Sequence, residues 1–260
     1  MHVRLPKPLH GWREFAGEVG IIVLGVLIAL TFGQLVEWVH SRQKQNEMME
    51  RLFEEARIDV AQLRDLEPDA ADMQLEVDFA TQLTKDNSCP PVERWMALET
   101  LGVYPQVRVR TSVYDEVIGA GGLSDIASTQ ARDAVAAFHA RLAWVQGQTD
   151  FFRSQPTVPV PIDDRRLTLI YDPQASEPEV TRFDRQALCD DHGFRNRMVD
   201  AVRDHVVWDG YRRTLAQSAI RMCGAIGRAL GRQCTPSAGT PFTDAERRLA
   251  EDTDAQAGQR

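Results

Sequence analysis

The most apolar part of this chain is GEVGIIVLGVLIALTFGQLVEWVH, from Gly17 to His40. Its central part, Val19 to Val36, contains no charged residue. A helix of roughly 18 residues is about 27 Å long, close to the roughly 30 Å hydrocarbon core of a bilayer. Trp12 and Trp38 flank the apolar run, as interfacial tryptophans do in membrane spans. The stretch therefore predicts a helix that crosses a membrane.

Two other interpretations of this stretch stay open, a cleaved export signal and a buried core helix. A cleaved signal has a shorter apolar region followed by small residues, whereas Leu35, Val36, Glu37 and Trp38 follow here. Core helices rarely continue this far without a charge. We therefore expect a permanent signal anchor at residues 18–39, preceded by a short arm of residues 1–17.

The orientation of the anchor depends on the residues around it. The positive-inside rule gives almost no preference, because basic residues are balanced on the two sides, namely Arg4, Lys7 and Arg13 against Arg42, Lys44 and Arg51. The N-terminal arm is short and carries the terminal amine, while the segment after the span is long and acidic and can be translocated regardless of its charge. We expect a cytoplasmic N-terminus and a periplasmic main domain.

The N-terminal passage WREFAGEVGIIVLGVLIALTFGQLVEWV resembles the start of a family of uncharacterised bacterial inner-membrane proteins with a single span, and Gly17, Glu18, Gln34 and Trp38 match its pattern. A second similarity lies in TSVYDEVIGAGGLSDIASTQARDAVAAFHARL, from Thr111, where a helix ends at a glycine-rich turn. The resemblance covers the first forty or so residues well, the middle loosely and the last third hardly at all. It implies a helical extracytoplasmic domain and carries over no functional residues.

Composition limits the classes of function. The chain has 260 residues and a net charge of -8, and it has no basic stripe of the kind that binds nucleic acid. Residues 40–235 are long enough to form one domain with its own hydrophobic core. We expect no nucleic-acid partner.

Helical periodicity continues beyond the anchor. Apolar residues recur at steps of three and four between residues 49 and 63, which predicts a helix whose intervening charged residues are solvated. A stop at residues 66–68 precedes a second helical segment at 69–86. Three later helices are expected, starting at Thr111 or Ser112, capped at Ser128, and spanning residues 191–233. The predicted fold is all-α, a transmembrane helix continuing into an antiparallel helical bundle.

Two segments do not fit the helical pattern. Prolines at positions 156, 159 and 161 predict an extended strap across the helices. Leu167 to Tyr171 has the composition of a short strand, but we identify no partner strand for it. Residues 236–260 are interpreted as a flexible tail that contains one capping box, Thr243 with Glu246.

The four cysteines allow three pairings if the domain lies in an oxidising compartment. A single helix over residues 191–233 separates its ends by about 60 Å, whereas bridged Cα atoms lie within about 7 Å. This distance excludes pairing of Cys189 with Cys223 or Cys234. We therefore expect Cys89 to pair with Cys189 and Cys223 to pair with Cys234; four free thiols in a cytoplasmic domain are the alternative.

No motif of a known catalytic or cofactor site occurs in the sequence. It lacks the P-loop, the dinucleotide fingerprint, the nucleophile elbow and the C-x-x-C pair. His192 and His205 are not spaced as metal ligands on one helix face, and we interpret them as capping and surface residues. The glycine-rich segment Gly119 to Asp125 is interpreted as a helix-ending turn. We expect no cofactor, no metal and no enzymatic activity.

Within the span, Gly25, Ala29 and Gly33 recur every four residues and therefore lie on one face of the helix. Small residues at this spacing allow two membrane helices to approach closely. Gln34 lies beside this face and can add a hydrogen bond across the contact. We expect the span to be a site of homo-oligomerisation.

These observations favour a membrane-anchored interaction or accessory protein of the bacterial cell envelope. Its expected partners are the lipid bilayer, a second copy through the span, and an envelope protein that the sequence does not identify. An extracytoplasmic helical bundle that senses a small molecule is the alternative, because bundles often bind ligands between helices. An enzyme with an unrecognised site is a third class.

Overall fold

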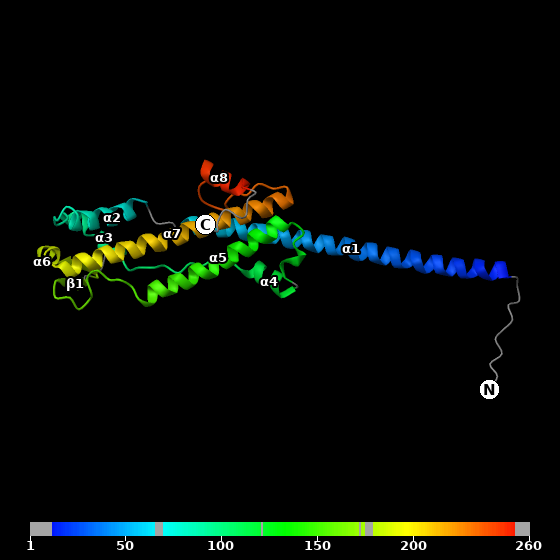
Figure 1. The fold of residues 1–260 in the computed structure, drawn as a ribbon, viewed down its shortest axis with the longest axis horizontal. Coiled ribbons are helices and arrows are strands. Elements are labelled where there is room, and N and C mark those ends of the chain that lie inside the picture. Colours follow the sequence, from blue (N-terminus) through cyan, green and yellow to red (C-terminus); the bar gives the residue numbers. More distant parts are fainter. Residues whose placement is uncertain (1–11, 66–69, 121, 172, 175–178, 253–260) are drawn as a thin grey trace, which may run out of the picture. The chain divides into compact units, whose positions relative to one another are not determined.

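The computed structural model describes residues 12–65, 70–120, 122–171, 173–174 and 179–252 (Figure 1). The chain divides into two compact units, residues 1–50 and 51–260. Most described residues are helical, which confirms the predicted all-α class. The stop expected at residues 66–68 and the first eleven residues of the expected arm lie outside the described residues.

The first unit contains the N-terminal part of α1, a helix of 54 residues (Trp12–Asp65). A window of this helix has a mean hydropathy of 2.5, and none of it is buried inside the protein. Ile21, Ile22 and Phe32 are 74%, 66% and 65% exposed. The helix is long and apolar enough to cross a membrane. The side chains of Trp12 and Glu18 lie outside the described ones, and Trp38 is exposed beneath the guanidinium of Arg42.

The second unit is organised around α7 (His192–Leu230), which runs beside α5 (Thr129–Ser154) and α2 (Ala70–Thr84) (Figure 1). Trp208 of α7 contacts Thr149 of α5, and Tyr211, further along α7, contacts the earlier residue Trp144. These two helices are therefore antiparallel, as expected for a bundle. Gly210 does not interrupt α7, because neighbouring residues on both sides pack against α5.

Shorter elements connect these helices. They are η1 (Val92–Arg94), α3 (Ala97–Thr100), α4 (Ser112–Ala120), η2 (Leu123–Asp125) and α6 (Arg185–Cys189). Pro91 precedes η1, and the segment VERWMALETL that follows it contains a 3-10 turn and one α turn. Ser128 caps α5 through a hydrogen bond from the amide of Ala131, which confirms the sequence prediction.

One core cluster lies between α2, the η1–α3 segment and α7. Trp95 is its centre and contacts the rings of Phe79 and Phe194, with ring centroids 5.3 and 6.0 Å away. The indole nitrogen of Trp95 donates to the carbonyl of Pro90, so its polar atom is satisfied inside the core. This cluster fixes α2 to the N-terminal half of α7.

The strap has a strand partner that the sequence analysis missed. Residues of β1 (Leu167–Tyr171) pair antiparallel with β2 (Glu179–Phe183), with Leu167 opposite Phe183 and Tyr171 opposite Glu179. The partner segment EVTRF contains two adjacent β-branched residues, a strand signal that the helical pattern around it obscured. The proline-containing part before β1 is extended and anchored, because Arg197 donates to the carbonyl of Pro159.

The segment expected as a flexible tail is folded up to residue 252. It contains α8 (Asp244–Glu251), which packs on α7 and begins with the predicted capping box of Thr243 and Glu246. Phe242 and Ala250 are buried. These contacts correct the expectation for residues 236–252: two apolar side chains in a polar segment were enough to dock it. Residues 253–260 lie outside the described residues.

Candidate functional site

The cysteines form the two disulfide bonds expected from the sequence. Cys89 is bonded to Cys189 and Cys223 to Cys234, with Cα atoms 5.5 and 5.6 Å apart. The first bridge connects the segment after α2 to the end of α6. The second connects α7 to the segment that follows it. Disulfides persist in oxidising compartments and are rare in the cytosol, so their presence indicates an oxidising compartment for the second unit.

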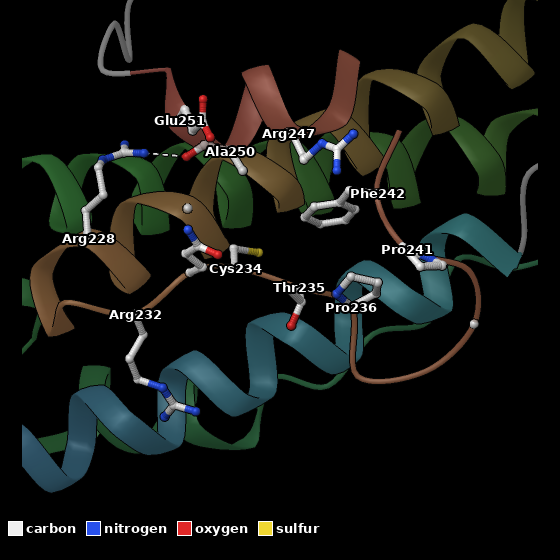
Figure 2. A pocket seen from close by; sticks show the side chains of 13 residues that line it. Arg228, Arg232, Cys234, Thr235, Pro236, Pro241, Phe242, Arg247, Ala250 and Glu251 are labelled. Carbon is white, nitrogen blue, oxygen red and sulfur yellow. Dashed lines mark hydrogen bonds between the residues drawn. The ribbon is translucent and has the colours of Figure 1, made fainter. Parts of the chain in front are cut away.

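A pocket with a volume of about 640 Å³ lies near the C-terminal end of α7 (Figure 2). Its walls come from α7, from α8 and from the segment between them, residues 231–243, which we call the connecting loop. The loop begins at Gly231, whose positive φ of 68° ends α7 in the left-handed conformation that favours glycine. The disulfide then holds the loop at Cys234, a residue of the pocket wall.

Two glycines of α7 allow this close packing. A Cβ atom at Gly224 would overlap the carbonyl oxygen of Ala250 in α8. A Cβ atom at Gly227 would lie 2.7 Å from the carbonyl oxygen of Arg232 in the connecting loop. Because these two positions carry no side chain, α8 and the connecting loop can both pack directly against α7.

Three arginines line the pocket, and each has a different environment. Arg228 donates to the carbonyl oxygens of Ala250 and Asp252 at the end of α8, and its Nε is buried without a hydrogen-bond partner. Arg247 pairs with Asp244 one turn earlier in α8. Arg232 pairs with Glu54 of α1 and lies over the ring of Phe53, so its guanidinium points away from the pocket toward α1.

The connecting loop is also bonded to the part of α1 that belongs to the second unit. Arg57 donates to the carbonyl of Thr235 at 2.8 Å, and Arg64 donates to the carbonyl of Thr240 at 2.6 Å. Arg64 also forms an ion pair with Glu246 of α8, with an N–O distance of 2.8 Å. The connecting loop and α8, which form two walls of the pocket, are therefore also held by α1.

A buried polar network lies at the middle of α7, away from the pocket. The Nδ1 atom of His205 is 2.7 Å from one carboxylate oxygen of Glu76, and Thr100 donates to the other at 2.6 Å. His205 is 7% exposed and Glu76 is 1% exposed. The prediction of His205 as a surface residue is therefore wrong. The network ties α2, α3 and α7 together.

Aromatic rings enclose this network. Tyr104 meets the rings of His205 and Trp208 edge to face, and the indole nitrogen of Trp208 donates to Thr149. The hydroxyl of Tyr104 is buried without a partner, and burial, together with the nearby carboxylate of Asp204, raises the pKa of Tyr104 to about 12. The surrounding side chains are packed, so we interpret the network as structural.

Two carboxylates of α1 are buried where the sequence analysis expected solvated residues. Glu55 accepts hydrogen bonds from the Ser112 hydroxyl and from the amides of Val113 and Tyr114, so it caps the N-terminus of α4. Asp59 is 1% exposed and accepts from the amide of Arg110 at 2.9 Å. Burial raises the pKa of Asp59 to about 7, and the charge of Glu55 contributes to this rise.

The other residues singled out from the sequence lie outside the pocket. Gly25, Ala29 and Gly33 lie in the first unit on the exposed apolar part of α1, and a Cβ atom at either glycine would have nothing within 4 Å. His192 is exposed at the start of α7, in agreement with its interpretation as a surface residue. Among the described residues, no group of three or more His, Cys, Asp or Glu side chains is arranged to hold a metal ion.

Sequence reasoning did not find the pocket or the buried carboxylates. One signal was available, because RMCGAIGRALGRQC places three arginines, three glycines and two cysteines at the end of a helix. Comparison of the chain with protein-family models, curated proteins and solved structures found no match.

Proposed function

We propose that this chain is a membrane-anchored interaction protein of the bacterial cell envelope, with a cytoplasmic N-terminus and a periplasmic helical domain. The observation that carries the proposal is the continuity of α1. The same helix supplies an exposed apolar segment in the first unit and core residues such as Leu52 and Phe53 in the second. Exposed apolar side chains of this number are stable in lipid and costly in water.

The disulfides support the proposed orientation. Two bonded pairs favour an oxidising compartment for the helical domain, and we propose that the short N-terminal arm remains in the cytoplasm. The resemblance of the N-terminal passage to single-span inner-membrane proteins agrees with this orientation.

An exposed apolar surface on the domain supports the proposed role in protein interaction. It consists of Trp144 and Phe151 on one face of α5, 43% and 55% exposed, with the partly exposed Tyr211 of α7 in contact with Trp144. We call these three residues the aromatic surface. Exposed clusters rich in Trp and Tyr are typical of protein interfaces. We propose a second envelope protein as the partner, held near this surface by the shared membrane.

The experiment is crosslinking in intact cells followed by purification of the full-length protein in mild detergent. The variant Trp144→Ser/Phe151→Ser should lose a crosslinked partner that wild type retains. Ile162→Ser is the control, because Ile162 is also exposed, at 79%, but lies in the strap. A partner retained equally by all three proteins would contradict the assigned surface, and a product containing only copies of this chain would contradict the assigned partner.

A further inference from the structure

We propose that the pocket at the end of α7 binds a small organic anion that carries an apolar ring or chain, because Arg228 and Arg247 line it together with Phe242. This inference goes beyond anchored protein interaction and does not depend on it. The ligand would be a carboxylate, sulfonate or phosphate monoester of low molecular mass.

The first observation that supports an anionic ligand is the charge of Arg228. Its guanidinium is held by two main-chain carbonyl oxygens at the end of α8 rather than by a carboxylate. The end of a helix carries only about half of a negative charge, so a large part of the arginine charge is not compensated. Its Nε also remains without an acceptor. A bound anion would supply the missing charge and acceptor atoms.

Arg247 is a second cation of the pocket wall (Figure 2), whereas the cation over the ring of Phe242 is Arg64 of α1. It pairs with Asp244 on the same helix, but both side chains are largely exposed, and such pairs separate at little cost. The carboxylate of Glu251 also lines the pocket and opposes an anion near the end of α8. Arg228 stays on its two carbonyl acceptors and Arg247 can turn toward a ligand, so the two arginines outnumber this one acidic group.

Part of the remaining wall is apolar, next to the polar residues Gln233 and Thr235. Phe242 is 8% exposed, and Pro236 and Pro241 lie beside it in the connecting loop. A volume of about 640 Å³ is within the range of roughly 300–1,000 Å³ that small-molecule sites occupy. Phosphate alone would leave this wall uncovered, so the ligand needs an apolar portion as well as a charge.

The pocket is held in shape before a ligand arrives. The Cys223–Cys234 bond, the capping box at Thr243 and the bonds of the loop to α1 fix three sides of it. Preorganisation lowers the entropic cost of binding. The loop is also bonded to Arg57 and Arg64, so a ligand that tightens the loop would stabilise its contact with α1.

The test is isothermal titration calorimetry of the full-length protein in an uncharged detergent, with phenyl phosphate as the probe. Inorganic phosphate and benzyl alcohol are the two comparison compounds. Inorganic phosphate has the negative charge without an apolar ring, and benzyl alcohol has the ring without a charge. We expect phenyl phosphate to bind at one site per chain, at least about tenfold more tightly than either comparison compound.

The variant Arg247→Gln should weaken phenyl phosphate binding by about tenfold or more, the loss expected for one charge-assisted contact. Arg248→Gln is the matched control, because Arg248 is the next residue of α8, is exposed and does not line the pocket. A Cys223→Ser/Cys234→Ser variant, checked for helicity by circular dichroism, should also bind more weakly because the loop is released.

Equal weakening by Arg247→Gln and Arg248→Gln would overturn the site, since it would reveal attraction by net charge alone. Absence of phenyl phosphate binding, or equal affinity for benzyl alcohol, would overturn the ligand class. Neither result affects the proposed protein interaction, which depends on the aromatic surface and is measured by crosslinking.

Discussion

The two parts of α1 reverse the usual relation between polarity and burial. In the first unit, apolar residues such as Ile21 and Ile22 are exposed, whereas in the second the carboxylates of Glu55 and Asp59 are buried. Among the described residues, no other element covers the first part, and lipid is the solvent that suits its apolar side chains. The second part is surrounded by protein that supplies hydrogen-bond donors. The partners available to each part of a helix therefore determine which of its residues are buried.

The largest expected effect comes from charges placed in the apolar part. Leu24→Lys/Ile28→Lys should release the protein from the membrane, because each lysine at the centre of a span costs about 3 kcal/mol. Carbonate extraction of membranes measures the retained fraction. Val103→Lys, a change at a residue 55% exposed in the second unit, is the control and should leave extraction unchanged. Retention of the double variant in the membrane would contradict the claim that lipid surrounds the apolar part of α1.

The next effect is a pH dependence caused by Asp59. Its pKa is raised from 3.8 to about 7 in the folded protein, so folding binds a proton between these values and stability falls as pH rises from about 4 to about 7. The loss approaches roughly 4 kcal/mol. Asp59→Asn should remove this loss and be more stable than wild type at pH 8. Urea unfolding monitored by tryptophan fluorescence at pH 4 and pH 8 measures the difference. If the difference in free energy of unfolding between Asp59→Asn and wild type does not change with pH, the assigned burial of Asp59 is contradicted.

A smaller loss is expected for the cap that α1 provides to α4. Glu55→Ala removes acceptors for the Ser112 hydroxyl and two amides, and should lower the free energy of unfolding by about 3 kcal/mol. Glu55→Gln retains one acceptor oxygen and should lose less. The neighbouring Glu54→Ala is the control in the same urea unfolding measurement. Equal effects of Glu54→Ala and Glu55→Ala would show that the cap does not contribute to the free energy of unfolding.

The smallest expected effect concerns the ion pair between α1 and α8. Arg64 and Glu246 are mostly buried, with side chains 16% and 19% exposed. Glu246→Gln keeps an acceptor for the capping box but loses the charge, so we expect a loss of about 1 kcal/mol. Raising the salt concentration should reduce the difference from wild type only slightly. A loss that disappears in high salt would indicate that the pair is solvated.

The sequence predicted those features that depend on local pattern. The apolar length of residues 19–36, the caps at Ser128 and Thr243, and the single long helix that excluded two cysteine pairings are all local or one-dimensional. Helical periodicity was sufficient for the all-α class. These predictions needed no knowledge of which helices are neighbours.

The sequence did not predict features that depend on distant partners. Nothing in the surroundings of Glu55 or Asp59 indicates that residues 110–114 would supply donors. His205 was expected on the surface because its partner, Glu76, lies on another helix. Likewise, β1 was left without a strand partner, and the pocket was missed because it requires α8 to fold back onto Gly224. In each case the missing information was the identity of a residue far away in the chain.

The most direct test of the proposed anchor and orientation is protease treatment of spheroplasts that contain the full-length protein, with the inner membrane intact. We predict that external trypsin digests the helical domain of residues 51–252 and leaves a short membrane-embedded N-terminal fragment of α1. Full protection of the domain, with digestion only after the membrane is permeabilised, would contradict the proposed orientation. Release of the intact chain into the soluble fraction would contradict the anchor itself.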